Sequence, residues 1–149
     1  MRVRRAREAD AEVLAGFQTE MARETEGLAL SPPTVLAGVR AVFADPAKGA
    51  YWVAEEGGEV VAGLLVVPEW SDWRNGTVLW IHSLYVRPQF RRQGVFRALF
   101  RRLRGVVDAD HSLKGLRLYV ERNNSAACRA YEAMGMDGEH YRLYEWMKG

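Results

Sequence analysis

The stretch from Leu84 to Phe96 combines residue types that bind anions. A strand-like run ends at a basic turn, which is followed by Gly94 and an amphipathic helix. Backbone N–H groups at such a turn, with the positive end of the helix dipole, form a site for a phosphate group. Arg91 and Arg92 add positive charge, and Gly94 lets the backbone approach a phosphate closely. Taken alone, the stretch is equally well explained as a solvated turn.

A second stretch, from Val120 to Met136, places an asparagine at a helix start and a tyrosine seven residues further on. At about 100° per residue, Asn124 and Tyr131 fall on the same helical face. Each has a purely structural explanation, Asn124 as an N-cap and Tyr131 as a half-buried packing residue. The separation and order of the two stretches favour a joint functional interpretation.

Together the two stretches resemble the GNAT superfamily of acetyl-CoA-dependent N-acetyltransferases. The family's pyrophosphate-loop pattern follows a strand that ends Leu-x-Val-x-Pro, and its matches here are Leu84, Val86, Pro88, Arg91 and Gly94. The family's later pattern, Asn-x-x-Ala-x-x-x-Tyr-x-x-x-Gly-Phe, is matched by Asn124, Ala127, Tyr131 and Gly135. The resemblance covers nearly the whole chain. It implies an α/β (α+β mixed sheet) GNAT-like acyl-CoA N-acyltransferase fold, in one domain of residues 1–149.

The resemblance also implies a role for each matched residue, with acetyl-CoA as co-substrate. The backbone of Leu84, Tyr85 and Val86 would pair with the pantetheine arm, and one N–H group there would polarise the thioester carbonyl. The turn that would hold the pyrophosphate consists of Arg91, Arg92, Gln93, Gly94, Val95 and Phe96. Asn124 would bind the pantetheine arm, and Tyr131 would protonate the leaving thiolate, since a phenol of pKa about 10 carries its proton at neutral pH. An amine would attack the acetyl carbonyl directly in a ternary complex.

Two residues depart from the family pattern. Phe96 stands where the family usually has Gly or Ala, so the turn gains a ring that either packs inward or narrows the phosphate site. Met136 replaces the usual Phe after Gly135, which is a change between apolar residues of adaptable shape. The chain beyond Met136 is short, which predicts an abbreviated C-terminal hairpin.

The general base is not fixed by either pattern. Some family members carry Glu at the position that Trp80 holds here, and His82 lies two residues further, on the same strand face. An unperturbed pKa of about 6.5 makes His82 a candidate base. A histidine packed in the sheet, with a water relay to a distant carboxylate, is the alternative.

Two segments are candidates for the acceptor site. On the first predicted helix, Glu20 and Glu24 fall on the same apolar helix face as Phe17. Carboxylates are rarely buried without a partner, so their place on this face calls for one. Glu69, Trp70 and Trp73 belong to a predicted loop, and Trp80 follows in the next strand. Carboxylates and aromatic rings together suit an organic cation. Salt bridges to arginine and ordinary packing explain the same residues without a substrate.

These residues are positioned by a predicted order of elements, βααβββαβαβ, which is a mixed sheet with helices on both faces. The predicted strands are 2–6, 51–54, 60–67, 77–86, 116–121 and 141–147, with a hairpin at Gly57-Gly58. Asp10 is predicted to cap the first helix, which contains residues 13–21. The other predicted helices are 31–45, 94–107 and 125–134, and residues 69–76 are a predicted loop.

Composition limits the function further. The chain has 149 residues, of which 48% are apolar, and this suits one globular domain. Its longest apolar run, residues 60–67, is too short to cross a bilayer, and the basic N-terminus leads into acidic residues, so we expect no signal peptide and no membrane association. The single Cys128 suits a reducing compartment, and three scattered histidines give no metal site. The sequence therefore predicts a cytoplasmic, metal-free protein.

The predicted function is transfer of an acetyl group from acetyl-CoA to a primary amine of a small cationic molecule. A non-catalytic acyl-CoA-binding regulatory domain, or acetylation of a protein or peptide amine, is the alternative. Nucleic-acid binding is not expected, because the arginines of residues 91–104 have the spacing of a solvated amphipathic helix. A homodimer is common among such proteins, but the sequence locates no interface.

Overall fold

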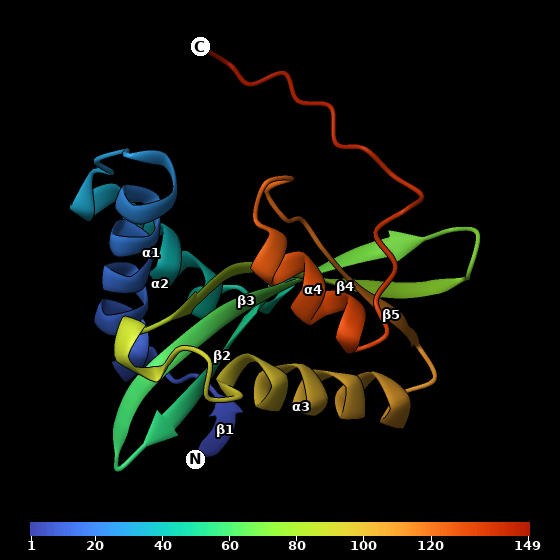
Figure 1. Ribbon diagram of the computed structural model, residues 1–149, viewed down its shortest axis with the longest axis horizontal. Helices are drawn as coiled ribbons and strands as arrows, with labels where there is room; N and C mark the ends of the chain where they lie inside the picture. Colours follow the sequence, from blue (N-terminus) through green and yellow to red (C-terminus); the bar gives the residue numbers. More distant parts are fainter. The chain divides into compact units, whose positions relative to one another are not determined.

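The chain divides by its internal contacts into two units, residues 1–118 and residues 119–149, in a computed structural model that describes all 149 residues. The first unit holds a sheet whose strands are Arg2–Arg5 (β1), Ala50–Glu56 (β2), Glu59–Ser71 (β3), Gly76–Val86 (β4) and Leu113–Leu118 (β5). The strands lie in the order β1-β2-β3-β4-β5 (Figure 1). Neighbours are antiparallel except β4 and β5, which are parallel. The mixed sheet predicted from the sequence is confirmed.

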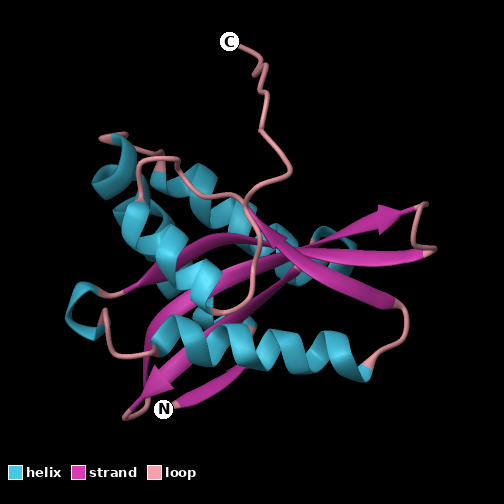
Figure 2. Ribbon diagram, turned by 45° about the vertical axis from the view of Figure 1, so that its right-hand side comes forward, coloured by secondary structure: helices cyan, strands magenta, loops and turns pink.

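Three helices belong to this unit: α1 (Ala11–Glu26), α2 (Pro32–Ala44) and α3 (Val95–Ala109). Tyr51 and Val53 of β2 are buried in the core that α1 and α2 form. Trp52, between them, instead has the guanidinium of Arg102 from α3 over its ring at 5.6 Å. Because successive strand residues point to opposite faces, α3 covers the face opposite to α1 and α2 (Figure 2). Helices on both faces were predicted and are confirmed.

Local signals account for most helix and strand boundaries. Ser31 caps α2 by accepting a hydrogen bond from the Thr34 N–H at 3.5 Å, and prolines occupy the first helical positions. The β2–β3 hairpin turns at Gly57 and Gly58, whose φ values of 59° and 83° favour glycine. Both features follow the sequence prediction.

Asp10 occupies the N-cap position of α1, as predicted, but its side chain makes no capping hydrogen bond to that helix. The buried Asp10 carboxylate accepts the Arg7 N–H at 2.7 Å and pairs with Arg4 at 2.8 Å. Asp10 therefore joins β1 to the short 3-10 turn η1 (Glu8–Asp10) that precedes α1. The Asp10 carboxylate pairs with Arg4 instead of with the first N–H groups of α1, because a buried carboxylate is stabilised most by a charged hydrogen-bonding partner.

The predicted loop over residues 69–76 is also wrong. β3 runs on to Ser71 and β4 begins at Gly76, so only residues 72–75 turn, with Asn75 at a φ of 47°. Glu69, Trp70 and Ser71 pair in register with Val78, Thr77 and Gly76. The polar and aromatic composition of this segment resembles a loop, but its backbone completes the β3–β4 ladder.

The second unit contains one helix, α4 (Ser125–Ala133), which ends before Gly135 at a φ of 87°. The sixth predicted strand, residues 141–147, is wrong: residues 134–149 contain no strand. The neighbouring predicted strand 116–121 is shifted and spans Leu113–Leu118. A strand needs a neighbouring strand to complete its backbone hydrogen bonds, and residues 119–149 contain no strand with which residues 141–147 could pair.

Two whole-chain observations complete the description. None of the helices is both long and apolar enough to span a membrane. No three His, Cys, Asp or Glu side chains gather as a metal ion would require.

Candidate functional site

One edge of β4 is open beyond the end of β5. β5 pairs with β4 only between Thr77 and Ile81, so the register ends at Leu118. Residues 82–86 of β4 continue past that point, while their other edge remains paired with β3 through Gly63. Over residues 83–86, this edge of β4 pairs with no strand of the sheet. An extended ligand can pair with such an edge as an added strand does.

A β-bulge lies within this open segment. Leu65 of β3 pairs with His82, whereas Gly63 pairs with Tyr85, so β4 contains one extra residue at this point. Ser83 has a φ of 54°, in the left-handed region. Bulges change the direction of a strand and of its side chains, and they are frequent beside active sites. Sequence reasoning missed Ser83, and no local signal marked it, because glycine is the residue expected at such a φ.

The turn after β4 presents backbone donors in succession. It follows the 3-10 turn η3 (Pro88–Phe90), and it contains Arg92 at a φ of 62° and Gly94 at a φ of 79°. The N–H groups of Arg92, Gln93 and Gly94 donate to no backbone carbonyl. Val95 begins α3, where N–H groups have no partner within the helix. Successive donors at a helix N-terminus can bind an anion, so this geometry is compatible with the phosphate site predicted from the sequence.

Two side chains hold this turn in place. Arg91 Nε donates to the Val86 carbonyl at 2.8 Å, and Gln93 Nε2 donates to the Gln89 carbonyl at 2.9 Å. Arg92 and Gly94 are exposed, and open space surrounds the position where Gly94 would carry a Cβ. Gly94 and the exposed guanidinium of Arg92 thus leave the donors accessible.

The Phe96 ring lies along α3, the helix to which it belongs. It is half-buried, and its centroid lies 6.1 Å from that of Phe100. Of the two alternatives open for Phe96, this contact supports packing rather than a ring that fills the turn.

Glu24, predicted at the acceptor site, contacts two residues predicted for the cofactor. Its carboxylate pairs with Arg91 Nη2 at 2.8 Å and accepts from the Tyr85 hydroxyl at 3.4 Å. The Arg91 guanidinium also lies over the Tyr85 ring at 5.4 Å. Burial, and then the nearby Glu24 charge, raise the pKa of Tyr85. The end of α1 is thereby joined to the turn after β4.

His82 and Trp80 share a face of β4, as their spacing predicted. Their rings stack at 6.1 Å with an angle of 6° between planes. The Arg117 guanidinium from β5 lies 5.8 Å from the Trp80 ring and forms an ion pair with Glu69 of β3 at 3.0 Å. Partial burial lowers the pKa of His82 below its usual value of about 6.5, so its imidazole is neutral at pH 7. A neutral imidazole can accept a proton.

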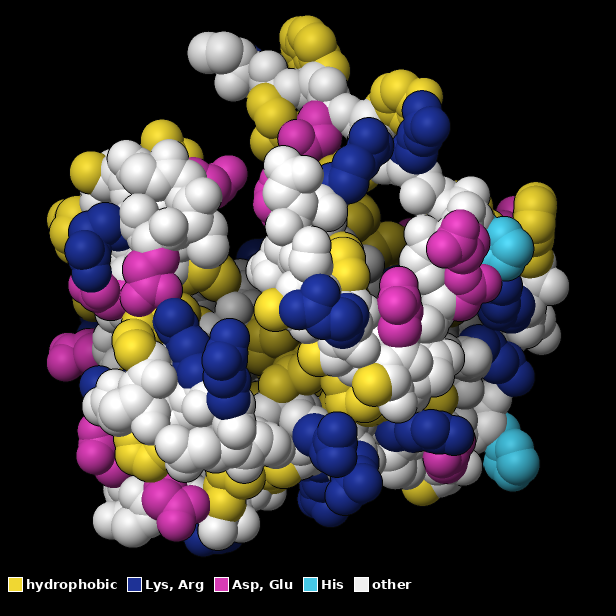
Figure 3. Space-filling model, viewed as in Figure 1, with side chains coloured by type: hydrophobic (Ala, Val, Ile, Leu, Met, Phe, Trp, Pro, Cys, Tyr) yellow, Lys and Arg dark blue, Asp and Glu magenta, His cyan; other side chains and the backbone are white.

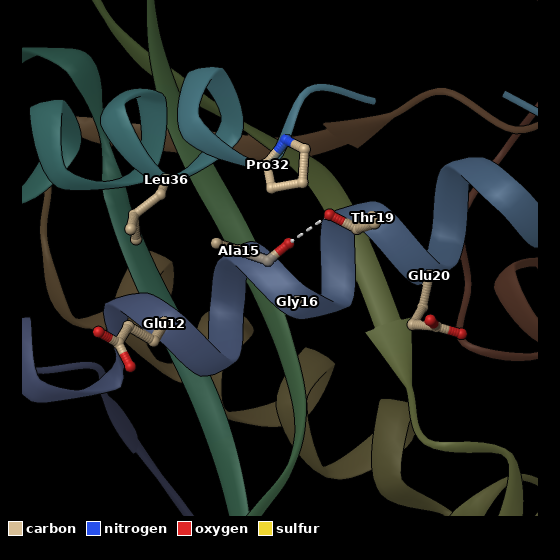
Figure 4. A pocket seen from close by; sticks show the side chains of 7 residues that line it. All are labelled: Glu12, Ala15, Gly16, Thr19, Glu20, Pro32 and Leu36. Carbon is tan, nitrogen blue, oxygen red and sulfur yellow. Dashed lines mark hydrogen bonds between the residues drawn. The ribbon is translucent and has the colours of Figure 1, made fainter. Parts of the chain in front are cut away.

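Glu20 lies apart from Glu24, although both are on α1. Glu20 forms an ion pair with Arg23 and lines a groove between α1 and α2 (Figure 4). The groove is lined by Glu12, Ala15, Gly16, Thr19, Glu20, Pro32 and Leu36. Glu20 is not paired with Arg91 as Glu24 is, although the charge of Glu20, like that of Glu24, raises the pKa of Tyr85.

Trp70 and Trp73 lie at the far end of β4 from the turn. Both side chains are mainly exposed at the β3–β4 hairpin. Trp70 pairs with Thr77, which is separated from Tyr85 by roughly 26 Å along the strand at about 3.3 Å per residue. The structure does not bring these two rings to the open edge of β4.

Asn124 and Tyr131 belong to the second unit. Asn124 Oδ1 accepts the Ala127 N–H at 3.2 Å and so caps α4, which leaves its NH₂ group available as a donor. Tyr131 lies seven residues further along the same helix and is half-buried. Burial raises the pKa of Tyr131 above its ordinary value, so the phenol is protonated at neutral pH.

Comparisons with known proteins identify the family and the fold. A model of the acetyltransferase (GNAT) family matches residues 14–136. No curated protein matches the chain. A possible acetyltransferase from Clostridium difficile 630 is similar in structure, with a TM-score of 0.90 and 40% identity over 99% of this chain and 97% of that one.

Two further structures share the fold at lower identity. One is a ribosomal-protein-alanine N-acetyltransferase from Brucella melitensis biovar Abortus 2308, with a TM-score of 0.79 and 16% identity over 99% of both chains. The other is an aminoglycoside antibiotic 6'-N-acetyltransferase from Acinetobacter haemolyticus, with a TM-score of 0.74 and 17% identity over 99% of both chains.

Proposed function

The chain belongs to the acetyltransferase (GNAT) family, and from that premise we propose that it transfers an acetyl group from acetyl-CoA to a primary amine of a small cationic molecule. The observation that carries the proposal is the open edge of β4 leading directly into a turn of free backbone donors. An extended arm ending in a pyrophosphate requires this pair of features, one for the arm and one for the phosphates.

In the proposed complex, backbone groups of Leu84, Tyr85 and Val86 pair with the pantetheine arm. The N–H groups from Arg92 to Val95 bind the pyrophosphate, and the Arg92 side chain adds its charge. Asn124 donates its NH₂ group to the arm. As the amine attacks, one β4 N–H group stabilises the negative charge that develops on the thioester oxygen.

Two protons move in the proposed reaction. The amine nitrogen forms a bond to the acetyl carbon and the carbon–sulfur bond breaks. His82, which is neutral at pH 7, accepts the proton from the amine nitrogen, and Tyr131 gives its proton to the leaving sulfur. The amide and the free thiol of CoA are the products.

The proposal requires residues 1–149 to act as one domain, because His82 and Tyr131 belong to different units. The family match supports this, since residues 14–136 extend across the boundary at residue 118.

The acceptor class rests on two carboxylates, Glu24 beside the open edge and Glu69 further along β3, opposite Val78. Glu24 and Glu69 each pair with an arginine, so a cationic amine would take the place of Arg91 or Arg117 as their partner. The fold-related proteins include enzymes named for an aminoglycoside and for a ribosomal-protein alanine. A screen that follows thiol release with polyamines, aminoglycosides and alanyl peptides separates a small cation from a peptide amine.

The first test of the cofactor site is isothermal titration with acetyl-CoA. We expect micromolar binding by the unaltered protein and loss of binding in Arg92→Glu combined with Gly94→Asp, because both changes place negative charge at the phosphate donors. Arg97→Glu is the matched control, since it reverses one exposed charge on α3 outside the turn. Thermal unfolding of each variant reports whether it is folded.

Binding that survives in the double variant would place the cofactor elsewhere. Absence of binding by the unaltered protein would overturn the catalytic proposal, whereas binding without thiol release for any amine would favour a non-catalytic acyl-CoA-binding domain.

A further inference from the structure

Five exposed arginines lie where α3 packs against β1 and β2, and we call them the arginine surface. Arg5 ends β1, and the other four, Arg97, Arg101, Arg102 and Arg104, belong to α3. Figure 3 shows Lys and Arg side chains along the lower part of the molecule, where Figure 1 draws α3. Within residues 1–118, none of the five forms an ion pair with a carboxylate. Their positive charge is therefore not neutralised by the unit to which they belong.

Trp52 of β2 holds two of these arginines close together. Its side chain is buried, and the guanidinium groups of Arg5 and Arg102 each lie 5.6 Å from the centre of its ring. The two groups are therefore separated by no more than twice this distance. Arg5 reaches the ring because it pairs in register with Trp52, and Arg102 reaches it from α3. A guanidinium that stacks on an aromatic ring keeps the N–H groups at its edge available for hydrogen bonds.

The other three arginines extend the positive surface along α3. At about 100° per residue, Arg97, Arg101 and Arg104 fall within about 60° of one another around the helix. At about 1.5 Å per residue, they span roughly 10 Å along it. Asp108 is the only acidic residue of α3. Like charges held side by side repel one another, and a bound anion relieves this repulsion.

We propose that the arginine surface binds an acidic segment of another protein. Arg5 and Arg102 each offer parallel N–H groups to a carboxylate, and this paired geometry is the one in which arginine binds Asp and Glu most strongly. Because Trp52 already orients both guanidinium groups, less side-chain freedom is lost when the carboxylates bind. The three arginines along α3 meet further carboxylates over roughly 10 Å, which is about three residues of extended chain.

Nucleic acid fits this surface less well. A protein held on duplex DNA commonly contacts about six to ten phosphates, and it reads base edges with amide side chains as well as with arginine. α3 contains no Asn, Gln, Ser or Thr. The whole chain carries 21 Lys and Arg residues against 19 Asp and Glu residues, so its long-range attraction for a long polyanion is small. A short acidic segment needs only the local surface.

Fluorescence anisotropy with a labelled oligoglutamate peptide and the full chain tests the proposal. We expect saturable binding at physiological ionic strength that weakens as salt is added, since salt screens exposed charges. Arg5→Gln with Arg102→Gln should raise the dissociation constant about tenfold, because it removes two charge-assisted pairs. Arg74→Gln with Lys114→Gln is the matched control, since it removes two exposed positive charges outside the arginine surface. It should change the dissociation constant by less than about twofold.

A second pair of substitutions separates the paired geometry from charge alone. Arg5→Lys with Arg102→Lys keeps both charges but loses the planar donors, and it should weaken binding by roughly threefold. Thermal unfolding reports whether each variant is folded. Absence of binding by the unaltered protein, or equal weakening in the control and in Arg5→Gln with Arg102→Gln, would overturn the proposal. Tighter binding of a single-stranded oligonucleotide of the same charge would also overturn it and assign the surface to nucleic acid.

Discussion

Arg91 shows how a residue of the anion-binding turn differs from its sequence-level interpretation. Its guanidinium makes a hydrogen bond to the Val86 carbonyl, an ion pair with Glu24 and a contact with the Tyr85 ring. Arg92, its neighbour, is exposed and has a left-handed backbone, and its N–H group donates to no backbone carbonyl. Arg91 therefore holds the turn in place, whereas the exposed Arg92 is the residue that the proposal assigns to the phosphate.

The Glu24–Arg91 pair leads to a prediction about cofactor affinity. Glu24→Gln removes a negative charge close to the phosphate donors and leaves Arg91 free to attract the pyrophosphate. Because exposed ion pairs are worth about 0–1 kcal/mol, we expect the dissociation constant for acetyl-CoA to fall by roughly two- to fivefold, and less at high salt. Titration calorimetry at two salt concentrations measures it, with Glu20→Gln as the control. Weaker binding by Glu24→Gln would show that the carboxylate supports the turn instead.

The pKa of His82 leads to a prediction about pH dependence. Burial lowers the pKa of His82 below its ordinary value of about 6.5. At a pH above this lowered pKa the imidazole is neutral and can accept a proton, and this form is lost as the pH falls through the pKa. We expect kcat/KM to decrease on that acidic side. His82→Gln should remove this limb and lower kcat/KM by about 10²-fold or more.

The control for this profile is His111→Gln, which changes an exposed histidine outside the site. An acidic limb that persists unchanged in His82→Gln would assign it to another group, and His82 would then be a packed residue of the sheet.

At the scale of elements, α1 approaches β3 so closely at Gly63 that a larger residue there would displace a side chain of α1. A Cβ on Gly63 would lie 2.7 Å from Leu14 Cδ2. Gly63 also pairs with Tyr85, immediately beyond the bulge at Ser83. Gly63 therefore takes part both in the contact of α1 with the sheet and, through its pairing with Tyr85, in the segment of β4 that has the open edge.

We expect Gly63→Ala to lower the free energy of unfolding by about 1–3 kcal/mol, since it overpacks the core. Gly16→Ala on the exposed side of α1 is the opposite case, because nothing lies within 4 Å of its Cβ and alanine favours a helix. It should stabilise the protein by up to about 1 kcal/mol. Urea unfolding measures both, and equal stability of Gly63→Ala and the unaltered protein would contradict the close packing.

At the scale of the whole molecule, the proposed reaction requires the two units to bind one ligand. The turn and the β4 edge belong to residues 1–118, whereas Asn124 and Tyr131 belong to residues 119–149. We expect acetyl-CoA to slow amide hydrogen exchange in both units, over residues 82–96 and over α4, because ligand binding stabilises the conformations that bind it. The matched control is the β2–β3 hairpin at Gly57-Gly58, where exchange should not change. Protection confined to residues 1–118 would exclude Asn124 and Tyr131 from the cofactor site.

The sequence by itself determined the features that depend on neighbours along the chain. The Gly57-Gly58 hairpin, the Ser31 cap and the succession of β4, turn and α3 are encoded by adjacent residues, whose backbone preferences act locally. The succession of backbone donors in the turn after β4 was predictable for the same reason, since these donors come from consecutive residues.

Only the tertiary structure decided what depends on residues far apart. Glu24 and Arg91 are 67 positions apart, and Glu69 and Arg117 are 48 apart, so their pairing depends on how α1 and the strands pack. The bulge at Ser83 depends on the register with β3, against local preference. Residues 141–147 have the composition of a strand yet form none, because a strand exists only where another strand completes its hydrogen bonds.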